Sequence, residues 1–287
     1  MGFGRLRAVG RGLRQPHGRG VGCGGLAGVA SQIARRVNPG IDERRRVVIA
    51  VVVTENLSKQ YNERFLWEGL NLRVKPGDVV AVRGESGSGK TTLLHCLGGL
   101  ESFGGSAVVS GVDVAALTRP GRRRYLGQTV SFLFQNYGLV DNWTVAKNLD
   151  LVRRGRGRAD FDQARREALA EVGLPPAVLA DRVFRLSGGE QQRVALARVV
   201  LKGGALIMAD EPTSALDDGN AERLTAVLER LAAAGAAVLV ATHDPRVIRR
   251  CSQEIVLGTL GGEDIGPRAA PPARAALTHS RDGGQTA

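Results

Sequence analysis

The sequence of 287 residues predicts an α/β fold: a mostly parallel sheet, an antiparallel β subdomain and an inserted helical subdomain. Short apolar runs bounded by polar residues, at 205–210 and 236–243, are typical of buried parallel strands. A glycine-rich stretch at 84–89 directly follows another apolar run and precedes an apolar helical pattern. Between about residues 116 and 185 the pattern changes to arginine-rich helical segments, which we assign to the inserted subdomain.

We expect one folded body at 47–261, with a tail on either side. Residues 1–46 are rich in Gly and Arg and show neither helical nor strand periodicity. Three explanations stay open for them: a disordered basic arm, a start codon placed too far upstream, or a targeting segment, although the stretch is too rich in glycine for a good signal-peptide core. Residues 262–287, which include "GPRAAPPARAA", predict a disordered C-terminal tail.

The formal net charge of +12 is concentrated near the N-terminus. Residues 1–46 contain ten arginines and two acidic residues, a net +8, so the other 241 residues carry only +4. A nearly neutral body argues against a basic nucleic-acid groove, and we expect no nucleic-acid partner.

Cysteine spacing and hydropathy indicate the compartment. Cys23, Cys96 and Cys251 lack paired or metal-ligand spacing, which indicates free thiols in a reducing environment. No apolar stretch approaches the ~20 residues that a membrane-spanning helix needs, so any work at a membrane requires another chain to span it. Together these features predict a cytoplasmic chain.

The first strands lead into a phosphate-binding loop. Segments 47–61 and 70–84 have the β-branched composition of strands, with a Pro-Gly turn at 76–77, and "GESGSGKT" follows in the pattern G-x-x-x-x-G-K-[ST]. The glycines let successive backbone N–H groups turn inward, and the helix behind them directs its positive end at a phosphate. Because strand, loop and helix are in register, a chance glycine turn is disfavoured. The phosphate-binding residues predicted from the loop are Gly84, Ser86, Gly87, Gly89, Lys90, Thr91 and Thr92.

These residue types predict a P-loop NTPase core that binds ATP and Mg²⁺. Lys90 supplies a cation for the β- and γ-phosphates, and the Thr91 hydroxyl can ligate the metal. Asp210 ends the apolar run "ALIMAD", so its carboxylate emerges where a second metal contact is needed. Glu211, one residue further on, is suitably placed to polarise an attacking water. An acidic pair after a strand is also a common helix cap, an alternative that the upstream P-loop disfavours.

The segment "LSGGEQQRVALARVVL" at 186–201 is the most diagnostic. Ser187, Gly188 and Gly189 precede a helical pattern and form a second anion-binding helix start. A chain with one P-loop has no obvious use for a second such start. Two copies arranged head-to-tail do, because each can clamp the γ-phosphate held by the other.

With these motifs the chain resembles an ABC-transporter ATP-binding subunit over about residues 52–258, and "LSGGEQQR" is similar to that superfamily's signature. The resemblance implies that Tyr61 stacks on adenine and that Gln135 in "FLFQNYGL" contacts Mg²⁺ and the membrane partner. It also implies that Asp217 in "SALD" links the two sites of a dimer and that His243 in "ATHDP" contacts the γ-phosphate. Glu211 and His243 are then the catalytic pair, and Thr91, Gln135 and Asp210 are the metal ligands.

Finer features resemble one branch of the superfamily. "LFQNYGLVDNWTVAKNLDL" and "ARVVLK" are similar to ATPases of lactococcin-type bacteriocin export, which are related to macrolide-export and lipoprotein-release ATPases. The resemblance implies a homodimer that hydrolyses ATP, peripheral on the inner face of the cell membrane through a separately encoded permease. A mechanical signalling role through a permease stays open. A soluble ATPase acting on nucleic acid or ribosomes is less favoured, because the chain has one P-loop, no heptad array and no Cys cluster.

The resemblance implies that the permease docks at Gln135 through about Leu151, including Asn136, Tyr137, Leu139, Val140 and Trp143. Aromatic side chains are favoured interface anchors, although packing in the subdomain's own core is an equal alternative for Trp143 and a less favoured one for Tyr137. Cargo and direction belong to the permease and are not readable from this chain.

Deleting residues 1–46 is expected to leave ATPase activity and dimerisation intact, because the segment has too little apolar surface to join a core. Turnover and gel filtration of the truncated protein measure this. Loss of folding would contradict the prediction. If only membrane recruitment fell, and fell more at low salt than at high salt, the arginines would be an electrostatic anchor.

Overall fold

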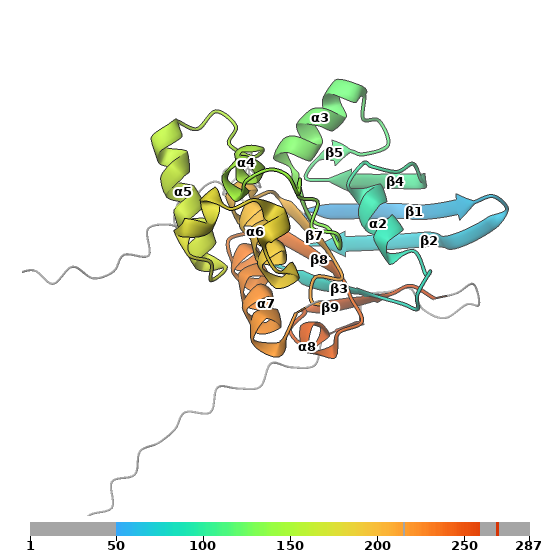
Figure 1. The fold of residues 1–287 in the computed structure, drawn as a ribbon. Helices are drawn as coiled ribbons and strands as arrows, with labels where there is room; N and C mark the ends of the chain where they lie inside the picture. The colour runs from blue at the N-terminus through green and yellow to red at the C-terminus, as the bar shows by residue number, and fades with distance from the viewer. Residues whose placement is uncertain (1–49, 215, 259–267, 270–287) are drawn as a thin grey trace, which may run out of the picture.

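Two β-sheets form the centre of the molecule, and helices cover the larger one (Figure 1). The computed structural model describes residues 50–214, 216–258 and 268–269. The predicted N-terminal tail therefore lies outside the described residues, as does the C-terminal tail except for one short strand, β10 (Arg268–Ala269). In the described part of the chain, no helix is both long and apolar enough to cross a membrane.

The larger sheet has the order β10-β9-β3-β8-β7-β6, and all neighbours in it are parallel except β10 against β9. Its parallel strands are β3 (Val79–Arg83), β6 (Val130–Leu133), β7 (Leu206–Asp210), β8 (Ala237–Ala241) and β9 (Gln253–Val256). Every residue of β7 and β8 is buried, because elements cover the sheet on both faces. This burial explains why these segments are continuous apolar runs rather than alternating ones.

The smaller sheet is antiparallel, with the order β2-β1-β4-β5. It consists of β1 (Val52–Tyr61), β2 (Arg64–Val74), β4 (Gly104–Val109) and β5 (Val112–Asp113). β1 and β2 form a hairpin in which Tyr61 pairs with Arg64. Its buried side chains, including Leu57 and Trp67, pack with the first helix of the core, α2 (Lys90–Leu97).

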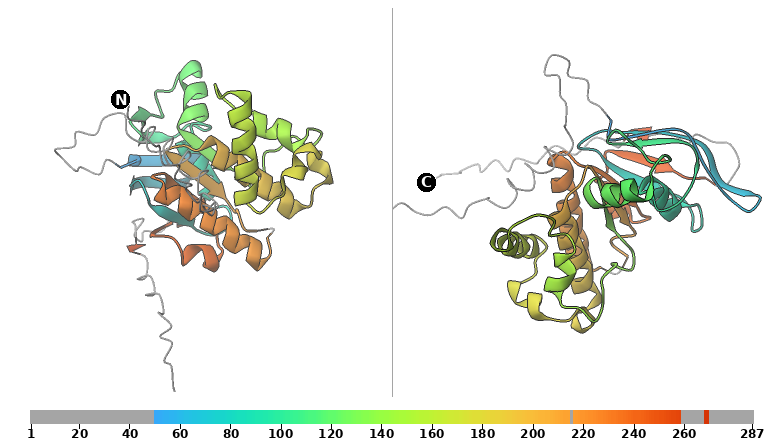
Figure 2. Two further views of the ribbon diagram at one scale, coloured as in Figure 1. Left: turned by 90° about the vertical axis from the view of Figure 1, so that its left-hand side faces the viewer. Right: turned by 90° about the horizontal axis from the view of Figure 1, so that it is seen from above.

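Side chains of the larger sheet alternate between two hydrophobic clusters. Val80 and Val82 face α2 and the antiparallel sheet, whereas Val79 and Ala81 face the opposite cluster. That opposite cluster contains α6 (Gly188–Lys202) and α7 (Asp218–Ala233), which cover the other face (Figure 2). The predicted α/β fold, with its antiparallel subdomain and inserted helices, is confirmed.

The inserted helices form the part of the molecule opposite the antiparallel sheet in Figure 1. They are α4 (Val145–Asp150), α5 (Arg158–Glu171) and the 3₁₀ turns η1 (Pro176–Ala180) and η2 (Val183–Arg185), all packed near α6. Thr144 is the N-cap of α4, and its hydroxyl accepts a hydrogen bond from the Lys147 N–H. α3 (Arg119–Gln128) precedes them, and the short α8 (Pro245–Ile248) follows β8.

One strand differs from the sequence expectation. β6 lies inside the stretch 116–185, which the pattern assigns to the helical subdomain, and it pairs with β7 in the larger sheet. Its four residues, "VSFL", are too short for periodicity to distinguish a strand from a buried helical turn. The structure therefore places Gln135 directly after a core strand.

Candidate active site

The carboxyl ends of four neighbouring parallel strands meet at one edge of the larger sheet. Val82 of β3 is in register with Ala241 of β8, and Ala241 with Asp210 of β7; Leu133 of β6 lies opposite Ala209. The chain leaves these strands toward the phosphate-binding loop, His243, Glu211 and Gln135 respectively. Ligands of open α/β sheets bind at such an edge.

The loop at 84–89 has a backbone that only glycine adopts readily. Gly84, Gly87 and Gly89 have φ angles of 153°, 81° and 91°. A Cβ atom on Gly84 would lie 2.6 Å from the Leu257 carbonyl oxygen, and one on Gly89 would lie 2.7 Å from the Trp67 indole nitrogen. The glycines at 84 and 89 are therefore required by close backbone approach as well as by φ.

Lys90 begins α2 and folds back onto the loop. Its Nζ donates hydrogen bonds to the carbonyl oxygens of Gly84, at 2.9 Å, and Glu85, at 3.0 Å. Ser86 is exposed and Thr92 is half-buried. The ammonium thus lies against the glycine loop, where the N-terminus of α2 adds further positive potential.

The next residue joins the loop to β7. Thr91 Oγ1 donates a hydrogen bond to Asp210 Oδ2 at 2.8 Å. Asp210 Oδ1 is buried and has no hydrogen-bond partner among the described residues. Burial raises the pKa of Asp210; the Thr91 hydrogen bond opposes this, and the nearby Glu211 charge adds to it. A buried carboxylate oxygen without a donor fits a hard cation, so these residues suit Mg²⁺.

Glu211 and His243, the predicted catalytic pair, are in contact. His243 Nδ1 lies 3.1 Å from Glu211 Oε1, and the imidazole is 79% exposed whereas the carboxylate side chain is 16% exposed. Glu211 has a φ of 43°, in the left-handed region that a glutamate rarely occupies. Its N–H donates to the Ala241 carbonyl at 2.8 Å, and Ser214 Oγ donates to the Glu211 carbonyl at 3.0 Å. Neighbours on both sides thus hold this unusual backbone.

An ionic network that no sequence motif indicates lies directly beside this pair. Asp244 accepts hydrogen bonds from Thr213 Oγ1, at 2.8 Å, and from Arg246 Nη2, at 2.7 Å. Arg246 also contacts Asp218, the first residue of α7. The bonds from Arg246 lower the pKa of Asp244 to about 2, although partial burial opposes them. The sequence "HDPR" signals a helix cap at Asp244, but not the ion pairs.

Tyr61 lies near the end of α2, the helix that follows the phosphate-binding loop. It is the last residue of β1, is 46% exposed, and donates a hydrogen bond from its Oη to Glu101. Glu101 also lies 3.4 Å from His95 Nδ1 of α2, so the structure brings Tyr61 beside the phosphate-binding helix.

Other predicted residues find partners elsewhere. Ser187 caps α6 in a capping box: its Oγ accepts from the Glu190 N–H at 3.3 Å, and its own N–H donates to the Glu190 carboxylate at 2.9 Å. A Cβ atom on Gly188 would meet the Tyr137 hydroxyl, and one on Gly189 would meet Leu216. Asp217 caps α7 through the Asn220 N–H. None of these contacts is with residues 84–92, so one chain does not bring Ser187, Gly188 and Gly189 to its own loop.

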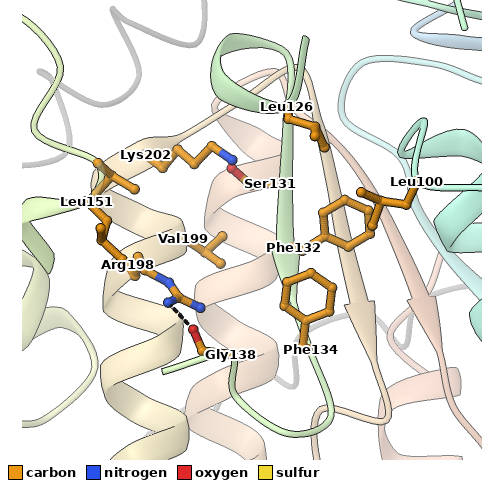
Figure 3. A pocket seen from close by; sticks show the side chains of 11 residues that line it. Leu100, Leu126, Ser131, Phe132, Phe134, Gly138, Leu151, Arg198, Val199 and Lys202 are labelled. Atoms are coloured by element: carbon orange, nitrogen blue, oxygen red, sulfur yellow. Dashed lines mark hydrogen bonds between the residues drawn. The ribbon is translucent and has the colours of Figure 1, made fainter. Parts of the chain in front are cut away.

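Gln135 is exposed and lies two residues beyond the end of β6. The segment that follows it contributes to the rim of a hollow in the surface. This hollow lies between β6, α3 and α6 (Figure 3). Phe132 and Phe134 stack in it with ring centroids 4.9 Å apart. Arg198 of α6 donates to the carbonyl oxygens of Tyr137, at 2.7 Å, and Gly138, which fixes the turn after Gln135. The hollow is lined by Leu100, Leu126, Phe132, Phe134, Leu151 and Arg198, among others.

A family model described as "ABC transporter" matches residues 67–214, which is 148 of the 287 residues. The chain belongs to the ABC transporter family. It is an ABC-type ATP hydrolase, the ATP-binding subunit of a transporter, as the resemblance predicts. Among its relatives, the lipoprotein-releasing system ATP-binding protein LolD of Anaeromyxobacter dehalogenans is 40% identical over 194 residues, which cover 66% of this chain and 81% of that protein. The LolD of Alcanivorax borkumensis is 39% identical over 219 residues, covering 72% and 94%.

Other members of the family match over a smaller share of their length or in three dimensions. The macrolide export ATP-binding/permease protein MacB of Marinobacter nauticus is 37% identical over 66% of this chain but only 30% of its own length. The dimeric structure of MJ0796, a bacterial ABC transporter cassette, superposes with a TM-score of 0.71 at 29% identity, covering 77% of this chain and 100% of that one. A post-hydrolysis dimer of the same cassette bound to ADP and Pi has a TM-score of 0.67, also at 29% identity, and covers 75% of this chain and 99% of that one.

Asp244 is expected to stabilise the fold above about pH 4 and to lose that contribution toward pH 2. Its pKa falls from 3.8 to about 2 in the folded chain, so the ionised form is favoured on folding, by roughly 2 kcal/mol. Asp244→Asn should therefore lower the free energy of urea unfolding by about that amount at pH 7, and by little at pH 2.

The matched control is Asp218→Asn, because that side chain is 91% exposed and an exposed ion pair contributes little to stability. A deficit of Asp244→Asn that does not shrink between pH 4 and pH 2 would contradict the assignment.

Proposed function

We propose that this chain binds Mg-ATP at the carboxyl edge of the larger sheet and hydrolyses it to drive a separate membrane permease. Two neighbouring contacts support this proposal most directly. The 2.8 Å hydrogen bond from Thr91 to Asp210 connects the start of α2 to β7, and the 3.1 Å contact between Glu211 and His243 joins residues that follow β7 and β8 in the chain. A metal-ligand pair and an acid–base pair thereby stand next to a phosphate cradle.

Binding of the triphosphate rests on the loop and α2. The backbone N–H groups of the loop 84–89 would donate to the phosphates, apart from that of Ser88, which donates to the Glu85 carbonyl at 3.1 Å. Lys90 would exchange its carbonyl partners Gly84 and Glu85 for the β- and γ-phosphates. Tyr61 stacks on the base. Thr91, Asp210 and Gln135 hold Mg²⁺, which, when bound, neutralises charge on the β- and γ-phosphates.

Hydrolysis is assigned to Glu211 and His243. The half-buried Glu211 carboxylate orients a water and accepts its proton while the water oxygen bonds to the γ-phosphorus and the bond from that phosphorus to the bridging oxygen of the departing ADP breaks. An ionised carboxylate only accepts hydrogen bonds, so His243 Nδ1 donates to Glu211 Oε1. Nε2 is then left to donate to a γ-phosphate oxygen when the exposed imidazole is protonated.

The site is completed by a second copy. Ser187 caps a 15-residue helix through Glu190, and the space beside Gly188 and Gly189 borders Tyr137 and Leu216 rather than the loop of the same chain. A head-to-tail homodimer supplies this helix start to the γ-phosphate of the other chain, while Asp217 connects the two sites. The dimeric MJ0796 structure, 29% identical, supports the dimer.

The permease is assigned to the hollow of Figure 3. Its floor is apolar, with Phe132 and Phe134 stacked, and Leu151 at its edge is 54% exposed. Gly138 and Leu151 of the segment 135–151 line this hollow, which supports the docking hypothesis. Tyr137 and Leu139 pack partly on the core, and Trp143 is half-buried with Lys147 Nζ 4.2 Å from its ring centroid. The exposed side chains Val140 and Leu151 are therefore the better anchors.

The resemblance to LolD and MacB supports a permease of the lipoprotein-release or macrolide-export branch. A macrolide-like molecule or a peptide of the bacteriocin type is then the candidate cargo. The chain would work as a peripheral protein on the inner face of the cell membrane, held there by the permease.

Glu211→Gln is expected to keep ATP affinity but lose most turnover, about a hundredfold or more, because it removes the base and keeps the shape. It should also accumulate a nucleotide-bound dimer on gel filtration. Lys90→Ala is the matched comparison, and it should lose ATP binding itself. Undiminished hydrolysis in Glu211→Gln would move the base elsewhere, and unchanged ATP affinity in Lys90→Ala would overturn the P-loop assignment.

Leu151→Glu is expected to abolish co-purification with the permease while basal ATPase activity stays within about twofold, because a charge enters the apolar hollow and Leu151 is not among the proposed nucleotide-binding residues. Val108→Glu on β4 is the control, a 37% exposed valine that does not line the hollow. Normal co-purification of a folded Leu151→Glu protein would place the docking surface elsewhere.

A further inference from the structure

Glu101 lies four residues beyond the end of α2. Its carboxylate contacts three side chains, two from β1 and one from α2. Tyr61 Oη of β1 donates to it, Lys59 Nζ lies 3.2 Å away, and His95 Nδ1 of α2 lies 3.4 Å away. Burial alone would raise the pKa of Glu101, but hydrogen bonds from these three side chains outweigh it and lower the pKa. The carboxylate therefore stays ionised and is a strong acceptor for the phenol.

Lys59 is the second fixed point beside the tyrosine. It is 8% exposed, and its Nζ donates to the Ser102 carbonyl at 2.6 Å as well as pairing with Glu101. The same ammonium lies 4.7 Å from the centroid of the Tyr61 ring. A buried cation on the ring and a carboxylate on its hydroxyl restrict a side chain that is otherwise 46% exposed.

We propose that Glu101 is a positioning residue for the nucleobase: it anchors the Tyr61 hydroxyl, so that the ring is held ready to stack on the base of ATP. This inference rests on the proposed role of Tyr61 in base stacking. No motif identifies Glu101, and the tyrosine that it anchors lies 40 residues earlier in the chain.

The effect belongs to nucleotide affinity rather than to turnover. An unanchored ring must be immobilised when the base binds, and this ordering weakens binding by about two- to twelvefold for a side chain of this kind. Phosphate contacts and the groups around Glu211 are unchanged, so kcat should stay within about twofold while KM rises.

Tyr61→Phe tests the anchor, because it removes the hydroxyl and keeps the ring. Its ATP dissociation constant should rise about two- to twelvefold, Glu101→Ala should match it, and the double variant should be no weaker than either single variant within about twofold. Binding of inorganic triphosphate, which lacks a base, should not change in any of them. If Glu101→Ala does not fold, because Lys59 loses its partner, Glu101→Gln takes its place with a smaller loss.

Tyr125→Phe is the matched control. Its buried hydroxyl donates to the carbonyl of Leu97, the last residue of α2, at 2.6 Å, and makes no hydrogen bond to Glu101 or Tyr61. This variant should lower the melting temperature and leave ATP affinity unchanged. Tyr61→Phe should instead weaken ATP binding and leave the melting temperature unchanged.

Several outcomes would overturn the inference: unchanged ATP affinity in Tyr61→Phe, multiplicative losses in the double variant, or an equal loss for triphosphate. Tyr61→Ala separates this from the proposed function. It should weaken ATP binding about five- to 150-fold if the ring stacks on the base. No loss in Tyr61→Ala would remove the base-stacking role itself, whereas a loss there without one in Tyr61→Phe would remove only the Glu101 anchor.

Discussion

The hydrogen bond from Thr91 to Asp210 is the contact on which the rest of the site depends, because it joins α2, the helix after β3, to the end of β7, a strand that is not a neighbour of β3. β8 lies between β3 and β7 in the sheet, so the start of α2 must reach across the end of β8 to meet the end of β7. The glycine loop provides that reach, and the complete burial of β7 fixes where Asp210 emerges. Whatever follows β8 then stands in the middle of the site. His243 occupies that position, within 3.1 Å of Glu211.

Motifs that are contiguous in sequence were predictable because their geometry is local. The spacing of Gly84, Gly89 and Lys90 specifies a loop between a strand and a helix, and "LSGGE" specifies a capped helix start. Burial on both faces of a parallel sheet produces continuous apolar runs, which is why β7 and β8 were recognisable. β6 was not recognisable, since a run of four residues carries no usable period.

Contacts between distant segments were out of reach of the sequence. Arg246 meets Asp218 from 28 residues away, and Lys59 meets Glu101 from 42 residues away, with nothing in either segment to announce the pairing. Each pair forms only because the fold has already brought β1 to α2, or α7 to the end of β8. His95 is an example of the same limit: its Nδ1 lies 3.4 Å from Glu101 Oε1, and its ring centroid lies 6.3 and 6.4 Å from those of Phe132 and Phe134 in the hollow.

The capping box at the start of α6 has a consequence for how reversible the proposed dimer is. Ser187 has one hydroxyl proton, and in the single chain Oγ donates it to the Glu190 carboxylate at 2.9 Å. Donation of that proton to a phosphate of a second chain releases only this bond, because the Ser187 N–H still donates to Glu190 and Oγ still accepts from the Glu190 N–H. The helix start therefore keeps its cap while its proton changes partner. The contact to the second chain can therefore form and break in every cycle without any refolding of α6.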